Sequence, residues 1–379
     1  MYNPKTLTQI KADLLRCALD QSHPMEMTRE EDVHQATDRL QTLDSDHWCQ
    51  VWSEIARPYE ERGQAEEKAG KFNLAKNNYM LAYNYYRMAR FPVPNTAAKK
   101  AAYRASVNNY VKASRYFDPP LERVVIPFEG RKGEGKEIRA YLRIPRGLER
   151  PAVLINHAGV DVFKEEQCLI EPAFLERGIA TFSMDMAGTG ESPVLGSLEG
   201  ERIYSPVISY LQNRGDVDGS RVGILGMSFG GYWVTKVAHI EQSRLKAAVC
   251  WGGGAHYVFQ PDWQYKCRYA PTHLGNEDLI VTRSHSFGIF SFEEWLEYVP
   301  KLSLLTQGIL DEPCAPLLIV NGKNDAHVPL EDHYLLLEHG DPKTVRLFPG
   351  GHMGMTPQTL PTIADWVRSS LYSQDRRRT

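Results

Sequence analysis

Residues 221–238 read RVGILGMSFGGYWVTKVA. The first five form a short apolar run that is typical of a buried parallel strand, and residues 232–238 show a helical pattern. Between them Ser228 stands in a Gly-x-Ser-x-Gly pentapeptide. We therefore expect a sharp turn from strand to helix. The serine should adopt a strained backbone conformation, and glycines should flank it because a Cβ atom there would clash.

A strand, a Gly-x-Ser-x-Gly turn and a helix, in this order, form the nucleophile elbow of the α/β hydrolases. The elbow exposes its serine hydroxyl at the carboxyl edge of a sheet and at the N-terminus of a helix. The alternative is a chance Gly-Ser-Gly turn, which the flanking strand and helix disfavour. Ser228 is therefore the candidate nucleophile.

The chain from residue 119 onward alternates short apolar segments with helical patterns. Residues 122–128 and 137–145 predict an antiparallel hairpin around a glycine-rich loop. Six further segments are predicted strands, most of them apolar throughout: 152–156, 179–183, 222–225, 247–250, 316–320 and 344–348. Such strands need cover on both faces of a sheet. The pattern predicts an α/β-hydrolase fold with a doubly wound sheet and an antiparallel start.

The first part of the chain, residues 1–118, predicts an N-terminal helical cap domain. Alanine and aromatic residues recur every three or four positions between residues 69 and 89, and alanines and apolar residues do so between 98 and 113. The pair resembles one tetratricopeptide-type hairpin, but no repeat period extends it. Two prolines at 119–120 mark the boundary to a hydrolase core at 119–379. Within this core, an aromatic-rich insertion at about 255–313 predicts a lid.

Composition excludes several classes of function. The 379 residues carry a net charge of -3, which gives no electrostatic basis for binding nucleic acid or an anionic membrane. The sequence has no transmembrane-length apolar stretch and no signal-peptide core, so we expect a cytoplasmic protein. Six scattered cysteines indicate reduced thiols and not a disulfide frame or a zinc site. Residues 185–192 only superficially resemble a phosphate-binding loop, and we expect no metal and no cofactor.

A nucleophilic serine needs a base within hydrogen-bond reach. In this fold the acid and then the histidine follow the serine along the chain. Asp325 and His352 each follow directly on a predicted strand, so both should lie at the same edge of the sheet as the serine. We expect His352 to be the general base and Asp325 to orient its ring. His327 is the rival base, and Asp311 and Asp341 are weaker acid candidates because neither directly follows a strand.

Acyl transfer also needs N–H donors that bind the oxyanion. One should be the backbone amide of Phe229, which follows the nucleophile at the start of a helix. The second should come from the loop at residues 157–161, with the amide of Val160 as the candidate and Gly159 allowing close approach. Asp161 either caps the following helix, or organises this loop and contacts substrate.

Together these motifs resemble the α/β-hydrolase group that includes 2,6-dihydroxypseudooxynicotine hydrolase, FrsA-type esterases and fungal polyketide-shortening hydrolases. Besides the elbow, Asp325 and His352, the resemblance rests on the YNYYRMA run at 83–89, on Gly-Val-Asp at 159–161 and on Gly-Thr-Gly-Glu at 188–191. It extends over nearly the whole chain. It implies a helical domain that closes over the core, a serine triad acting on ketones or esters, and a homodimer.

The leading hypothesis is a serine hydrolase that cleaves a carbonyl-activated C–C bond of the β-ketone type, or an ester, in an aromatic or polyketide-like small molecule. Tyr86 and Tyr257 are candidate contacts for a flat apolar ligand, although each could serve packing alone. His256 is the candidate polar contact. The alternatives are a carboxylesterase without C–C activity, and a non-catalytic regulatory protein on a hydrolase scaffold. An intact triad disfavours the second alternative.

Overall fold

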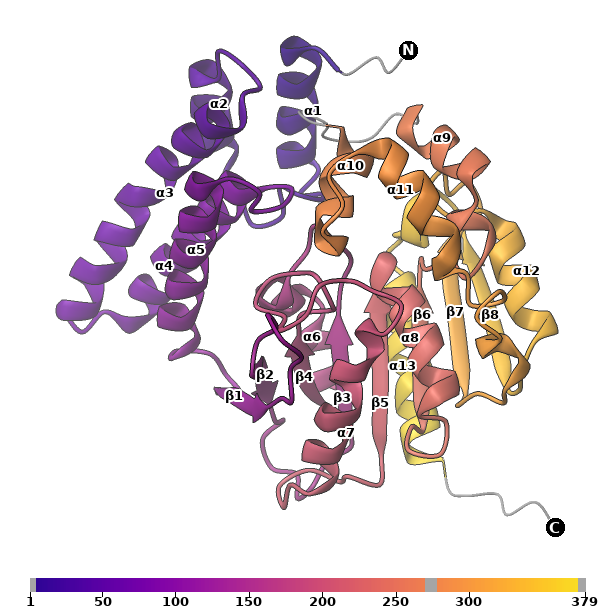
Figure 1. Cartoon of the computed structure of the whole chain (residues 1–379). Coiled ribbons are helices and arrows are strands. Elements are labelled where there is room, and N and C mark those ends of the chain that lie inside the picture. Colours follow the sequence, from indigo (N-terminus) through magenta and orange to yellow (C-terminus); the bar gives the residue numbers. More distant parts are fainter. Residues whose placement is uncertain (1–4, 270–277, 374–379) are drawn as a thin grey trace. The chain divides into compact units, whose positions relative to one another are not determined.

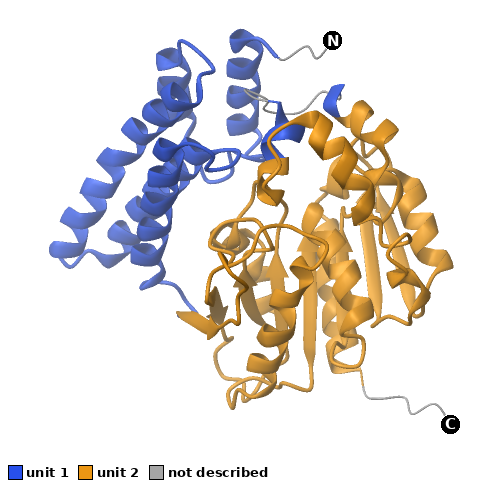
Figure 2. Cartoon of the chain, in the orientation of Figure 1, with its two compact units in different colours: residues 1–120, 268–283 blue, residues 121–267, 284–379 orange. Residues whose placement is uncertain are grey.

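The computed structural model describes residues 5–269 and 278–373, which fall into two compact units (Figure 2). The helical unit comprises residues 1–120 and 268–283, and the hydrolase unit comprises residues 121–267 and 284–379. We expected the whole 255–313 insertion to belong to the core. Residues 268–283, in the middle of the insertion, belong to the helical unit instead. A long insertion need not belong to the unit from which the chain enters it.

The helical unit begins with five helices: α1 (Leu7–Leu19), α2 (Glu30–Arg39), α3 (Ser45–Lys68), α4 (Phe72–Arg90) and α5 (Ala97–Ser114). Helices α3, α4 and α5 pack alongside one another (Figure 1). The expected apolar face of α4 is buried, with Ala75, Tyr79 and Ala82 fully inaccessible. The helix ends at Arg90, because Pro92 cannot continue it.

The hydrolase unit contains one eight-stranded sheet in the order β1-β2-β4-β3-β5-β6-β7-β8. Its strands are β1 (Leu121–Pro127), β2 (Glu137–Arg143), β3 (Val153–His157), β4 (Ala180–Met184), β5 (Val222–Met227), β6 (Ala247–Trp251), β7 (Leu317–Gly322) and β8 (Lys343–Phe348). Strand β2 is antiparallel to its neighbours β1 and β4, and all later pairings are parallel. The predicted α/β-hydrolase fold is confirmed, and the strand ends agree to within two residues.

Helices cover both faces of this sheet (Figure 1). Helices α6 (Glu171–Leu175) and α13 (Thr359–Tyr372) pack against each other, and their apolar side chains share one core with residues of β3, β5, β6 and β7. Helices α7 (Tyr204–Gln212) and α8 (Phe229–Ile240) lie on the other face. Helix α12 (Leu330–Glu338) connects β7 to β8. The carboxyl ends of the parallel strands therefore lie at one edge of the sheet, where their loops can build a site.

The insertion between β6 and β7 consists of short helices. They are η3 (Tyr257–Phe259), α9 (Pro261–Tyr269), α10 (Leu279–Ser284), η4 (His285–Phe287), α11 (Phe292–Tyr298), η5 (Val299–Leu302) and η6 (Ile309–Asp311). Within the hydrolase unit its aromatic residues pack on the elbow helix, since Phe259 and Phe287 contact the ring of Phe229.

All six cysteines fall among the described residues, and none of them forms a disulfide. Within the same ranges, no cluster of His, Cys, Asp and Glu side chains could hold a metal ion. None of the described helices is both long enough and apolar enough to cross a membrane.

Candidate active site

The turn after β5 places Ser228 in the conformation expected of an elbow. Its φ and ψ angles are 54° and -126°, a combination that a residue with a side chain adopts only at a cost of roughly 1–3 kcal/mol. Two backbone hydrogen bonds hold the turn: the Ser228 amide donates to the carbonyl of Trp251 at 2.7 Å, and the Gly231 amide donates to the carbonyl of Ser228 at 2.8 Å. The hydroxyl therefore stands at the N-terminus of α8.

The flanking glycines are required by close approach of the backbone. A Cβ atom on Gly226 would lie 2.2 Å from the carbonyl oxygen of Gly230. A Cβ atom on Gly230 would lie 2.5 Å from the carbonyl oxygen of Ala158 and 2.7 Å from Nδ1 of His157. Both glycines are therefore needed for the fold of the turn, whatever the serine does.

Gly226→Ala should destabilise the protein by about 3 kcal/mol, because the clashing atoms are backbone and cannot rotate away. The midpoint of urea unfolding reports this change directly. Gly215→Ala is the matched control, because a Cβ atom there meets nothing within 4 Å, and it should leave the midpoint nearly unchanged. Equal midpoints for the two variants would contradict this packing account.

The side chains of Ser228, His352 and Asp325 form one hydrogen-bonded chain. Nε2 of His352 lies 2.8 Å from Oγ of Ser228, and Nδ1 of His352 lies 2.8 Å from Oδ2 of Asp325. These residues follow β5, β8 and β7, whose carboxyl ends lie at one edge of the sheet (Figure 1). The rival base His327 lies beside His352, with 5.0 Å between ring centroids. It is His352, and not His327, that bridges the serine and the aspartate.

The Asp325 carboxylate is fully buried and surrounded by donors. Burial alone would raise its pKa, but hydrogen bonds from His352, from the backbone amide of His327 and from the side chain of Asn321 hold the pKa below its ordinary value. A carboxylate that stays ionised fixes the Nδ1–H tautomer of the neighbouring imidazole. Nε2 of His352 is then free to accept a proton from the serine hydroxyl.

The loop after β3 lies against Ser228. A Cβ atom on Gly159 would come within 3.0 Å of the Cβ of Ser228 and 3.4 Å of the amide nitrogen of Phe229. Val160 follows in the same loop and is buried. Neither the Phe229 amide nor the Val160 amide donates to a protein acceptor within the described chain. The two amides predicted for the oxyanion hole thus belong to segments in direct contact beside the serine.

Beneath this loop lies His157, the last residue of β3, which is inaccessible to solvent. Its Nε2 is 3.1 Å from the hydroxyl of Tyr204, and its Nδ1 is 3.5 Å from the carbonyl oxygen of Ala158. Burial lowers the pKa of His157 to about 4. The ring is therefore neutral at neutral pH, and it supports the loop at residues 157–161 by packing beneath it.

This buried histidine should make stability depend on pH. The unfolded chain binds the proton with a pKa of 6.5 and the folded chain with one of about 4, so the free energy of unfolding falls as the pH drops through this window. Between pH 7 and pH 5 the free energy of unfolding of the native protein should fall by roughly 2 kcal/mol because of this histidine. His157→Gln should abolish that part of the fall, as measured by urea unfolding at the two pH values. An unchanged pH dependence in His157→Gln would contradict the assignment.

The candidate substrate contacts have different surroundings. Nδ1 of His256 lies 2.7 Å from the hydroxyl of Ser303 within the insertion, and the half-exposed ring of Tyr257 packs on it. Tyr86 lies in the core of the helical unit, and its hydroxyl donates to Glu60 at 3.1 Å. It therefore belongs to a different unit from the triad. Asp161 follows Val160 in the loop after β3 and is partly exposed.

One alternative for Asp161 is wrong. The helical segment that follows, η1, begins at Lys164 with Phe163 in the capping position, so Asp161 is not its N-cap. The loop ends instead on Lys164, whose buried ammonium group lies within 2.9 Å of carboxylate oxygens of Glu165, Asp185 and Glu191. Asp185 opens the glycine-rich turn at 185–192, so this turn anchors the end of the loop that follows β3.

Three buried polar residues escaped the sequence analysis: Lys164, Asn321 and Asp332. The carboxylate of Asp332 on α12 accepts hydrogen bonds of 2.6–2.9 Å from the backbone amides of residues 256–258, and so fixes the start of the insertion. The sequence contained a signal for Asn321, because this residue directly precedes the loop that contains Asp325. A lone lysine or aspartate in a helical segment gives no comparable signal.

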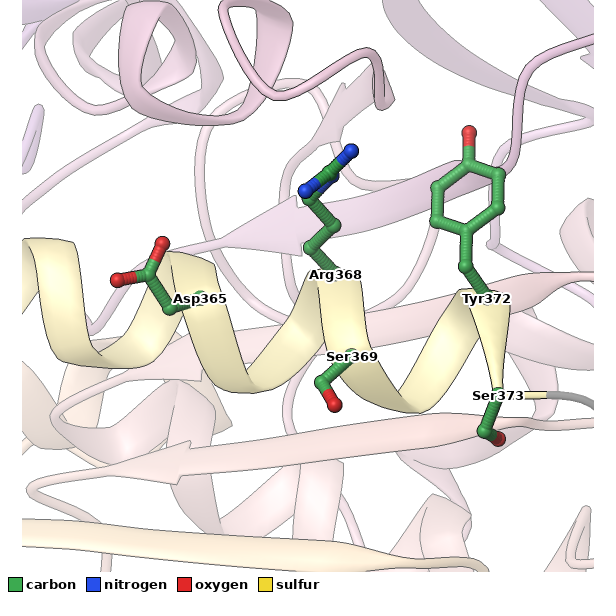
Figure 3. Close-up of a pocket in the computed structure, with 5 residues that line it drawn as sticks. All are labelled: Asp365, Arg368, Ser369, Tyr372 and Ser373. Carbon is green, nitrogen blue, oxygen red and sulfur yellow. The ribbon is translucent and has the colours of Figure 1, made fainter.

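A hollow of about 530 Å³ lies along α13 and is lined by Asp365, Arg368, Ser369, Tyr372 and Ser373 (Figure 3). The hydroxyl of Tyr372 donates to the carbonyl of Gly178 and accepts from the amide of Ala152. These partners precede β4 and β3, so the hollow lies toward the amino ends of the strands. It is at the opposite edge of the sheet from Ser228.

The sequence matches the model of a known protein family. The model of the family described as "Esterase FrsA-like" matches residues 25–371. The chain belongs to the FrsA-like esterase family. It is therefore a hydrolase with the α/β-hydrolase fold, and the suspected family is confirmed.

Curated relatives and solved structures agree with membership of the FrsA-like family. The chain is 26% identical to the 2,6-dihydropseudooxynicotine hydrolase of Paenarthrobacter nicotinovorans, over 84% of this chain and 83% of that one. It is 23% identical to Esterase FrsA of Photobacterium profundum, with 86% and 77% covered. The crystal structure of 2,6-dihydroxy-pseudo-oxynicotine hydrolase matches with a TM-score of 0.76 at 24% identity, over 94% and 95% of the chains. AbyA5 matches with a TM-score of 0.68 at 19% identity, over 94% and 98%.

Proposed function

We propose that this FrsA-like protein is a serine hydrolase whose nucleophile, base and acid are Ser228, His352 and Asp325. The observation that carries the proposal is the pair of 2.8 Å hydrogen bonds that links the three side chains at the elbow. The substrate would be a small molecule with an ester or with a C–C bond next to a carbonyl group. The expected cytoplasmic location and homodimer, and the absence of a cofactor, are part of this proposal.

In this mechanism Oγ of Ser228 attacks the substrate carbonyl while Nε2 of His352 takes the hydroxyl proton. The amides of Phe229 and Val160 bind the oxyanion of the tetrahedral intermediate. When the intermediate collapses, the leaving group takes the proton from His352 and an acyl-enzyme remains. Water, activated by the same histidine, then releases a carboxylic acid. An ester loses an alcohol in this way, whereas a C–C bond must lose a carbanion that a neighbouring carbonyl or ring stabilises.

Aromatic side chains beside the nucleophile support an apolar, flat substrate. The partly exposed ring of Phe229 lies 5.3 Å from that of Tyr232, 6.1 Å from that of Phe259 and 5.5 Å from that of Phe287, measured between centroids. The names of the relatives support both reaction types, since one is a pseudooxynicotine hydrolase and another an esterase. We propose His256, Tyr257 and Asp161 of the hydrolase unit as substrate contacts.

A screen of aryl 1,3-diketones and p-nitrophenyl esters, with both products identified by mass, tests this proposal. Cleavage of a diketone into an acid and a methyl ketone would support C–C hydrolysis. Turnover of esters alone would favour the second candidate, a carboxylesterase. No turnover of either class, together with no reaction of Ser228 with a fluorophosphonate, would favour a non-catalytic regulatory protein and contradict the proposal.

A further inference from the structure

Asn321, on β7, is fully buried and is hydrogen-bonded to the loops of both the proposed acid and the proposed base. Its Nδ2 donates to Oδ2 of Asp325 at 2.8 Å, the same oxygen that lies 2.8 Å from Nδ1 of His352. Its Oδ1 accepts from the backbone amides of Gly322 and Met353, both at 2.8 Å. One side chain therefore touches the acid and the residue that follows the base.

The contact with Met353 determines where the base stands. Met353 has a φ of 66°, a left-handed conformation that turns the chain directly after His352. Its amide is bound by Asn321, and its carbonyl accepts from Nε1 of Trp251 on β6 at 2.7 Å. Met353 is thus held by hydrogen bonds to two strands, β7 and β6. Of these two bonds, only the one to Asn321 on β7 involves a residue that also contacts Asp325.

The amide group of asparagine suits this position because it combines a donor and an acceptor. Oδ1 must be the acceptor, since it faces two backbone N–H groups, and Nδ2 must then face the carboxylate. An aspartate would set a second carboxylate against Asp325, and an alanine would leave the Met353 amide and one carboxylate lone pair without partners. Nε2 of His333 lies 3.4 Å from Nδ2, and burial lowers the pKa of His333 to about 4, so that ring stays neutral.

We infer that Asn321 is a positioning residue that holds the base loop against the acid loop and shares the negative charge on Oδ2 of Asp325 with His352. This inference rests on the proposed function, because it concerns the same three side chains. Without the amide, the carboxylate charge acts on the imidazolium alone and the base loop loses its link to β7. The imidazole should then hold its proton more tightly and meet the serine less often.

Asn321→Ala should lower kcat by about 10–100-fold and move the acidic limb of the kcat/KM profile to higher pH by about half a unit or more. Asn321→Asp preserves the shape of the side chain, so it tests the same point if the alanine variant does not fold. Its added charge should move the limb further. The other titratable groups near the imidazole are Asp325, His327 and His333, and both variants retain all three residues.

The matched control is Asn156→Ala. Asn156 is also fully buried, on β3, where its Oδ1 accepts from the hydroxyl of Ser183. Its loss should cost stability but leave the acidic limb at the wild-type pH. If Asn321 had only a structural role, Asn321→Ala would behave like Asn156→Ala. Its stability would fall, and the acidic limb of its kcat/KM profile would stay at the wild-type pH.

A readout that needs no turnover separates this inference from the proposed function. The titration of His352 can be followed by NMR, with the resonance assigned by its loss in His352→Gln. A higher pKa in Asn321→Ala and Asn321→Asp supports the inference even if no substrate is turned over. An unchanged titration and an unchanged limb would overturn it. The proposed function would still stand if Ser228→Ala abolished activity.

Discussion

Ser228→Ala should lower kcat by about 10⁴-fold or more for any substrate that the native protein turns over. The variant removes the only protein atom that the proposed mechanism bonds to the acyl group. The base, the acid and the oxyanion donors all remain, so the residual rate measures what they contribute without the nucleophile. Steady-state kinetics with the best ester or diketone from the screen gives the comparison.

Two further variants sharpen this result. Ser220→Ala removes an exposed serine hydroxyl before β5, bonded to Asp218, and should retain full activity. Ser228→Gly should be as inactive as Ser228→Ala. It should also be more stable than the native protein by about 1 kcal/mol, because glycine adopts a φ of 54° without strain. An active Ser228→Ala protein would show that another group is the nucleophile.

Asp325→Asn should lower kcat by about 10⁴-fold while leaving the fold intact. The amide is the same size as the carboxylate, and its oxygen can still accept from the backbone amide of His327. Its NH₂ group would face Nδ1 of His352, and this favours the tautomer with the proton on Nε2. That nitrogen then cannot accept the proton of Ser228.

Asp341→Asn is the matched control for the acid. Asp341 lies at an exposed position just before β8 and was the weaker acid candidate in the sequence. The variant should keep nearly the full kcat, and both variants should unfold at denaturant concentrations close to that of the native protein. A similar loss in both, or a loss below tenfold in Asp325→Asn, would contradict the assigned role.

Much of the hydrolase unit could be predicted because its signals are local. Apolar strands and the glycines around Ser228 reflect constraints that act within a few residues. The positions of Asp325 and His352 followed from the rule that parallel strands end at the same edge of a sheet. The same rule predicted that the loop of Val160 lies near Ser228, and a Cβ atom on Gly159 in this loop would come within 3.0 Å of the Cβ of Ser228.

The rest depended on contacts between residues far apart in the sequence. Lys164 meets Asp185 and Glu191, and Asp332 binds the amides of residues 256–258, across more than 70 positions in the second case. No periodicity or spacing reveals such pairs. The same reason explains why residues 268–283, in the middle of the insertion, could not be assigned to the helical unit.

The central claim is that Ser228 is an activated nucleophile, and mass spectrometry of the native protein after treatment with a fluorophosphonate tests it most directly. Trypsin should cut after Arg221 and Lys236, and the peptide at 222–236 contains Ser228 as its only serine. We predict one adduct per chain, located on Ser228 by fragmentation and lost in His352→Gln. An unmodified peptide, or an adduct that forms equally well without His352, would contradict the account.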